Sequence, residues 1–289
     1  MAYSATTGSI KEDLLSKVWY ITGVSRGFGK EFARSALGRG DKVAATARDT
    51  DSLSDLVAEF GDSVLPLPLD VTNRAQVFAT VAETVARFGR LDIVVNNAGY
   101  TLFGMVEEIT PEQLQHQLDV NLFGVFHVTQ AVLPILRAQG SGHIVQISSV
   151  GGIVAFQGMA GYHASKWALE GLTETLAQEV AQFGIKTTLV EPGGFATDNG
   201  GSSAVRTVPL PQYDGIRKAI QDLGPGAGWG DPVDAGHALL DIVDAQQPPA
   251  RVFFGAKPID IVEPVYAERL ETWRRWQPVA EKADGIPVA

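Results

Sequence analysis

The chain has 289 residues, 45% of them hydrophobic, which is enough for a large core in one or two domains. Its formal charge of −10 argues against nucleic-acid and anionic-membrane partners, and the lack of cysteine excludes disulfides and thiolate metal sites and favours a cytoplasmic location. No apolar stretch approaches membrane-spanning length, the first residues lack the apolar core of a secretory signal, and the scattered histidines show no metal-ligand spacing.

A strand, a glycine turn and a helix are predicted after a polar leader at 1–17. Residues 18–21 (VWYI) are a short apolar run, and apolar residues recur at helical spacing after 29. In the TGVSRGFG stretch between them, Gly23 allows a tight exit from the strand, Gly27 lets the backbone approach a ligand, and Gly29 permits close helix–sheet packing. Such a helix start favours a pyrophosphate, although a glycine string alone is weak evidence.

Strands and helices then alternate along the chain. Further strands are predicted at 42–47, 64–69, 91–95, 143–148, 186–190 and 251–255, and the longest helical regions at 111–136 and 162–184. This alternation predicts an α/β fold of Rossmann type, a doubly wound, mostly parallel seven-stranded sheet with helices on both faces. We expect one such domain over 18–256, a substrate-binding loop or lid at 195–232, and an extension at 257–289 with a helix at 261–276.

The end of the second strand bears on the type of nucleotide. In a dinucleotide fold an acidic residue near this point binds the 2′-hydroxyl of NAD, whereas an arginine accommodates the 2′-phosphate of NADP. Arg48 stands there, and Arg26 in the glycine loop supplies a second guanidinium, so NADP(H) is favoured. Either arginine alone is more often a solvated surface charge, and Asp49 could serve a ribose hydroxyl instead.

Five motifs in order resemble the short-chain dehydrogenase/reductase family. They are TGVSRGFG at 22–29, NNAG at 96–99, Ser149, YHASK at 162–166 and the Pro-Gly pair at 192–193. The resemblance covers about residues 18–255, and Ser149 precedes Tyr162 by thirteen residues, the spacing of the family serine. Phe28 departs from the isoleucine or leucine more common in the family, which bears on packing or cofactor fit.

The resemblance implies a catalytic set of Asn121, Ser149, Tyr162 and Lys166. Tyr162 would be the general acid/base, with the Lys166 charge one helical turn away favouring its ionised form and its amine bonding the nicotinamide ribose. Ser149 would donate to the substrate oxygen, and Asn121 would hold a water near the lysine. By themselves, Asn121 indicates an exposed helix residue and Asp70 a turn residue.

The resemblance also implies the residues that hold the cofactor. These are Gly23, Ser25, Arg26, Gly27, Phe28, Gly29, Arg48, Asp70, Val71, Asn97, Ala98, Gly99, Tyr162, Lys166, Pro192, Gly193 and Thr197. Candidate substrate contacts, mostly apolar, are Phe103, Val154, Phe156, Phe195 and Trp229. No metal is expected.

These features predict hydride transfer between NADPH and a carbonyl or secondary alcohol. The substrate is expected to be a lipophilic small molecule, and the protein is expected to be a homodimer or homotetramer. Two alternatives stay open: a non-catalytic NADP(H)-binding redox sensor, and an NADP-dependent epimerase or dehydratase. The intact set of four catalytic residues argues against a sensor. The about 35 residues after Gly255 are few for the substrate domain of an epimerase.

Overall fold

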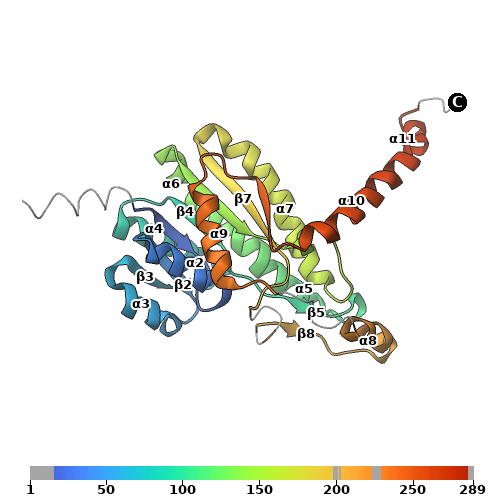
Figure 1. Cartoon of the computed structure of the whole chain (residues 1–289), viewed down its shortest axis with the longest axis horizontal. Coiled ribbons are helices and arrows are strands. Elements are labelled where there is room, and N and C mark those ends of the chain that lie inside the picture. The colour runs from blue at the N-terminus through green and yellow to red at the C-terminus, as the bar shows by residue number, and fades with distance from the viewer. Residues whose placement is uncertain (1–15, 198–200, 202, 223–228, 286–289) are drawn as a thin grey trace, which may run out of the picture.

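Seven parallel strands form the central sheet of the computed structural model (Figure 1), which describes residues 16–197, 201, 203–222 and 229–285. The strand order is β3-β2-β1-β4-β6-β7-β9, so the predicted doubly wound α/β sheet is confirmed, with every pairing parallel. Most of the predicted leader and parts of the predicted lid lie outside the described residues. The strands are β1 (Val18–Ile21), β2 (Lys42–Ala47), β3 (Val64–Pro68), β4 (Ile93–Asn96), β6 (Gly142–Ile147), β7 (Ile185–Pro192) and β9 (Arg251–Phe254).

Helices cover both faces of the sheet, and successive side chains of β1 feed the two cores. Trp19 and Ile21 pack with Phe32 on one face, whereas Tyr20 packs with Val77 on the other. Because both faces are buried, the strands read as continuous apolar runs. The first face carries α2 (Gly27–Gly38), α3 (Ser54–Phe60) and α9 (Pro232–Asp244), and the second carries α4 (Arg74–Phe88), α6 (Gly124–Gln139) and α7 (Ala160–Val180).

The strand order reverses between β1 and β4, where ligands bind in open α/β sheets. The two loops that leave these strands lie against each other. A Cβ on Gly23 would stand 2.9 Å from the Cα of Ala98, so only a glycine allows this approach. The motif after β1 and the motif after β4 therefore form one wall of a single crevice.

The long helical region predicted at 111–136 contains a break. Thr110 caps α5 (Pro111–Leu118), and a π-helical turn at Asp119–Phe123 then leads into α6. The wider turn carries Asn121, which is 1% exposed, so its indication as an exposed helix residue is wrong.

The sequence also predicts that no apolar stretch approaches membrane-spanning length, and this prediction is wrong by length and composition. The joined helix 111–139 meets both criteria. Three of its residues, Val128, Val132 and Leu136, are fully buried in the core against the sheet.

A second, two-stranded sheet was not expected from the sequence. β5 (Leu102–Phe103) pairs in parallel with β8 (Val205–Arg206), and the Thr207 N–H donates to the Phe103 carbonyl at 2.9 Å. This pairing attaches the predicted lid to the segment that follows β4, and α8 (Asp214–Asp222) continues from it. Strands of two residues carry no readable pattern, which is why the sequence did not reveal them.

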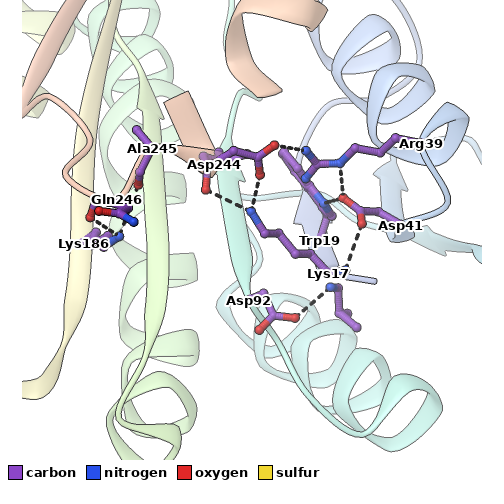
Figure 2. A network of polar contacts seen from close by, with 11 residues as sticks. Lys17, Trp19, Arg39, Asp41, Asp92, Lys186, Asp244, Ala245 and Gln246 are labelled. Carbon is purple, nitrogen blue, oxygen red and sulfur yellow. Dashed lines mark hydrogen bonds and ion pairs between the residues drawn. The ribbon is translucent and has the colours of Figure 1, made fainter. Parts of the chain in front are cut away.

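The amino ends of the strands are tied to α9 by a polar network (Figure 2). Asp41 accepts from the Trp19 indole N–H and from Arg39 Nε, both at 2.7 Å. Asp244, at the end of α9, accepts from Arg39 at 2.7 Å and pairs with Lys17. These bonds fix the amino ends of the strands, at the end of the sheet opposite the crevice.

The C-terminal extension predicted at 257–289 holds two helices, α10 (Pro258–Arg275) and α11 (Gln277–Ala283), where the sequence predicts one helix at 261–276. In Figure 1 they project away from the body beside α7. Val262 of α10 packs on a small cluster that includes Val154. Beyond this contact the exposed side chains include Trp273 and Trp276.

Candidate functional site

A cleft of about 610 Å³ opens at the carboxyl ends of the strands. It is lined by the loops that follow β1, β2, β4, β6 and β7, as a parallel sheet requires. All the predicted cofactor residues except Gly29 line it, together with Ser149, Phe103, Phe156, Phe195 and Trp229. Motifs from distant parts of the chain are thus gathered in one place.

The start of α2 faces this cleft and suits an anion. Arg26 stands at the N-cap position without a side-chain hydrogen bond to the helix, and the first turn holds no acidic residue. An arginine side chain has no acceptor atom, so it cannot cap the first N–H groups of α2 as Asn73 and Asp231 cap those of α4 and α9. Gly27, with φ of 57°, makes the turn before them. These features fit a dinucleotide pyrophosphate.

Gly29 serves packing, as its predicted role in helix–sheet contact requires, and does not line the cleft. A Cβ there would stand 2.3 Å from the Gly23 carbonyl oxygen and 2.5 Å from Asn97 Nδ2. Asn97 Nδ2 donates to the carbonyls of Thr22 and Gly23 at 2.9 and 3.0 Å. The asparagine of the second motif therefore holds the first motif in shape.

The end of β2 places Arg48 and Asp49 in different surroundings. Arg48 is exposed and lines the cleft beside Asp70. Asp49 instead accepts from the Asp51 N–H at 3.0 Å and caps the short helix Thr50–Leu53. Burial opposes ionisation of Asp70, but hydrogen bonds from Thr72 and the charge of Arg48 lower its pKa below the ordinary value.

Tyr162 and Lys166 lie one turn apart at the start of α7, where both line the cleft. Lys166 Nζ donates to the Ile147 carbonyl at 2.7 Å and stands 5.8 Å from the centre of the Tyr162 ring. Burial lowers the pKa of Lys166 to about 8, and the charge of Glu170 opposes this fall. An ammonium held here favours the ionised form of a nearby phenol.

Ser149 follows β6 and lines the cleft with Tyr162. Its Oγ accepts from the Gly151 N–H at 3.0 Å, which leaves the hydroxyl proton for another acceptor. Ser148 also lines the cleft, but its side chain is buried toward α7.

Asn121 does not line the cleft and supports its wall. Its Oδ1 accepts from the Tyr100 N–H at 3.1 Å, and its Nδ2 donates to the Tyr100 carbonyl and to Ser165 Oγ at 3.0 and 3.1 Å. Ser165 in turn donates to the Tyr162 carbonyl at 2.7 Å. Ser165 was missed in the sequence; its place directly before Lys166 was the available signal.

The apolar side of the cleft is only partly as predicted. Phe195 makes an edge contact with Phe28 at 4.9 Å between ring centres, so both rings pack on each other at the cofactor end. Val154 is a correction: it is 1% exposed and belongs to the cluster under α10, so it does not line the pocket. Tyr100, His116 and Met159 line the cleft and were not predicted from sequence.

Glu108 anchors the segment that covers one side of the cleft. Its carboxylate accepts from the Leu210 and Met105 N–H groups at 2.8 and 3.0 Å, from Thr207 Oγ1 at 3.0 Å and from Arg217 at 2.6 Å. These hydrogen bonds lower its pKa to about 2. Since the folded pKa lies below the ordinary value, the anchoring persists above that value and is lost only as pH falls toward about 2.

Replacing Glu108 with glutamine is expected to loosen this segment. The amide removes the charge that Arg217 pairs with and one acceptor position, so amides over 203–217 should exchange with deuterium about tenfold faster. The measurement is hydrogen exchange by mass spectrometry at neutral pH. Glu107→Gln is the matched control, because Glu107 is exposed and meets only Tyr213 Oη, at 2.7 Å, among the described contacts. Equal exchange in both variants would contradict the anchoring role.

The chain is similar in sequence and in fold to known proteins. Residues 17–205 match the family model described as short chain dehydrogenase. Oxidoreductase BOA17 of Botryotinia fuckeliana is 43% identical over 250 residues, covering 85% of this chain and 91% of that protein. A short-chain dehydrogenase from Streptomyces avermitilis has a TM-score of 0.87 at 38% identity, covering 93% of this chain and 98% of that one.

Solved structures with bound nucleotide are similar in fold and mixed in cofactor. The alcohol dehydrogenase of Thermococcus sibiricus, complexed with 5-hydroxy-NADP, has a TM-score of 0.70 at 27% identity and covers 83% of this chain and 96% of that one. A short chain dehydrogenase/reductase from Burkholderia phymatum in complex with NAD has a TM-score of 0.77 at 25% identity and covers 89% and 95%.

Proposed function

Because this chain belongs to the short-chain dehydrogenase family and is an oxidoreductase of that type, we propose that it transfers hydride between NADPH and a carbonyl or secondary alcohol. The observation that supports this most is that Tyr162, Lys166 and Ser149 line one cleft together with the start of α2, whose N-cap side chain makes no cap hydrogen bond. The bound nicotinamide would supply or accept the hydride.

The chain's own residues would orient the substrate and move its proton. Ser149 would donate a hydrogen bond to the substrate oxygen, and Tyr162 would give that oxygen its proton in the direction of reduction. Lys166, protonated below its pKa of about 8, would favour the phenolate that remains. Asn121 would keep the wall beside Lys166 in place through Tyr100 and Ser165.

We further propose NADP(H) rather than NAD(H) as the cofactor. Arg48 lines the cleft at the end of β2, and Arg26 lines it at the start of α2, so two guanidinium groups are available to a 2′-phosphate. The competing residue Asp49 is engaged as a helix cap, which weakens the case for a ribose 2′-hydroxyl partner. Relatives with either nucleotide leave the assignment to experiment.

Replacing Arg48 with alanine tests this preference. The KM for NADPH should rise about tenfold, as for the loss of one charge-assisted hydrogen bond, whereas the KM for NADH should change little. Arg87→Ala makes the same charge change on α4, where Arg87 pairs with Asp62 and does not line the cleft. A wild-type protein that prefers NADH, or an equal effect on both nucleotides, would contradict the assignment.

A substrate panel tests the reaction itself. NADPH oxidation should be seen with some apolar ketones or aldehydes, since Phe103 and Phe156 line the same cleft as the proposed acid/base. Tight NADPH binding without turnover across a broad panel would instead favour a redox sensor. Release of a dehydrated or epimerised sugar nucleotide would favour the third alternative.

We also propose that copies of the chain pair through the helices that carry the site. Four large apolar side chains are between 36% and 44% exposed: Leu114 on α5, Phe123 at the end of the π-helical turn, Phe126 on α6 and Trp167 on α7. Such residues on neighbouring helices favour association. A monomer at micromolar concentration in light scattering would overturn this proposal.

A further inference from the structure

Two buried glutamates lie behind Lys166, outside the residues given roles above. Glu170 is one turn after Lys166 on α7 and is 6% exposed, and Glu191 is near the end of β7 and is 1% exposed. Both carboxyl groups accept from the same nitrogen of Arg251, which brings them together. Buried carboxylates are costly unless they are paired, so their arrangement needs a physical account.

One arginine serves both acids. Arg251 NH1 donates to Glu191 Oε1 at 2.7 Å and to Glu170 Oε2 at 3.3 Å. Its other nitrogen pairs with Glu174, which is 62% exposed, so the guanidinium spans from the interior to the surface. One cation cannot neutralise two buried carboxylates and an exposed one together, and this mismatch favours a proton on the inner pair.

The surroundings of the pair complete the charge balance. Lys166 and Glu174 face it from α7, Arg251 from β9, and Ser148 from the end of β6, while Tyr266 of α10 lies near Arg251. With Lys166 and Arg251 protonated and Glu174 ionised, a single proton shared by Glu170 and Glu191 makes the group neutral. Two ionised acids would leave it with one excess negative charge in a buried place.

Glu170 also lies close to the cleft. A Cβ on Gly152 would meet Ser148 Oγ at 2.7 Å and Glu170 Oε1 at 3.0 Å, so both atoms lie beside that glycine. Ser148 lines the cleft, and its hydroxyl helps lower the pKa of Glu170, although the two groups are not aligned for a regular hydrogen bond. Glu170 therefore lies next to a residue of the cleft lining.

We propose that Glu170 and Glu191, the buried acid pair, share one proton near neutral pH and act as positioning residues that set the charge facing Lys166. This proposal rests on the proposed function in one respect, the part that Lys166 takes in hydride transfer. Glu170 supplies the negative charge that opposes loss of the Lys166 proton, and Glu191 limits how often Glu170 carries it.

The surroundings of the two acids act on their pKa values in the direction that this arrangement requires. Burial and the charge of Glu170 raise the pKa of Glu191 to about 7, with Arg251 opposing the rise. Burial likewise raises the pKa of Glu170 above its ordinary value, against the Ser148 hydroxyl and the Arg251 charge. A charge behind the lysine therefore changes within the neutral range.

Two substitutions should move Lys166 in opposite directions. Glu170→Gln removes the nearest negative charge, so the pKa of Lys166 should fall by about one pH unit. Glu191→Gln frees Glu170 to stay ionised, so the pKa of Lys166 should rise. Glu174→Gln is the matched control, because Glu174 lies on the same helix and meets the same arginine at the surface. A purely structural role would not produce opposite shifts.

The experiment is carbon NMR of the full chain labelled at lysine Cε and glutamate Cδ, titrated from pH 4 to 10 without substrate. We expect one glutamate of wild type to titrate near pH 7, and the alkaline limb of the pH–rate profile to follow Lys166 in each variant. The proposal is overturned if both acids titrate below about pH 5, or if the two variants shift Lys166 the same way or not at all. Expected shifts without turnover would support the acid pair and count against the proposed function.

Should Glu170→Gln fail to fold, the wild-type glutamate titration decides the sharing of the proton. Glu170→Asp, which keeps the charge on a shorter chain, should return the pKa of Lys166 toward its wild-type value. Failure of that rescue in a folded variant would count against the role of the charge.

Discussion

Tyr162→Phe is expected to lower turnover with NADPH by about 10³-fold, because general acid/base catalysis by one positioned group contributes on this order. The phenyl ring keeps the shape of the side chain, which is 6% exposed at the start of α7. Cofactor affinity and the midpoint of thermal unfolding should therefore change little. NADPH absorbance gives the rate, and fluorescence quenching gives the affinity.

The matched control for this substitution is Tyr100→Phe. Tyr100 also lines the cleft, and it contacts Asn121 through its backbone rather than its hydroxyl. Loss of its hydroxyl should change turnover by less than about threefold. If Tyr162→Phe keeps wild-type activity, or if Tyr100→Phe is the variant that loses it, the proton donor has been assigned to the wrong residue.

Gly29→Ala is expected to reduce the free energy of unfolding by about 1–3 kcal/mol, since added atoms in a packed place force the backbone to shift. The new methyl group would stand 2.3 Å from the Gly23 carbonyl oxygen, which is backbone and cannot rotate away. Because Gly23 shapes the loop before α2, NADPH affinity should fall with stability. Urea unfolding followed by tryptophan fluorescence measures the first effect.

Gly38→Ala, at the other end of the same helix, should have the opposite sign. A Cβ at Gly38 meets no heavy atom within 4 Å, and its backbone needs no positive φ. Alanine in a helix is favoured over glycine by about 0.5–1 kcal/mol, so this variant should be slightly more stable than wild type. Two variants of equal stability would show that the contact with Gly23 does not constrain the fold.

Several parts of this molecule were readable from local sequence. Two strands predicted at 42–47 and 64–69 are found at Lys42–Ala47 and Val64–Pro68. These strands and the glycine turn after β1 depend on short apolar runs and on residues with distinctive backbone freedom. The Tyr162–Lys166 spacing placed both side chains on one helix face, and the structure gathers them with Ser149 in the cleft. These features depend on neighbours a few residues away, which the order of the residues records directly.

Other parts depended on contacts that local sequence does not record. Asn121 looked exposed because helical spacing cannot show a π turn that rotates it inward. Val154 looked like a pocket residue because nothing local indicates that α10 covers it. The anchoring role of Glu108 gave no signal, since Leu210 and Arg217 lie about a hundred residues later.

The sequence by itself therefore determined the α/β alternation, the glycine turn and the residues that can carry a dehydrogenase chemistry. Only the tertiary structure decided which amide side chains support the cleft and that Glu108 anchors the segment 203–217. It also decided that Glu170, Glu191 and Arg251 meet behind Lys166. Arg251 lies 81 and 60 residues beyond those two acids along the chain. Such meetings follow from how strands are ordered in a sheet, and the energy of a buried charge depends on every group around it.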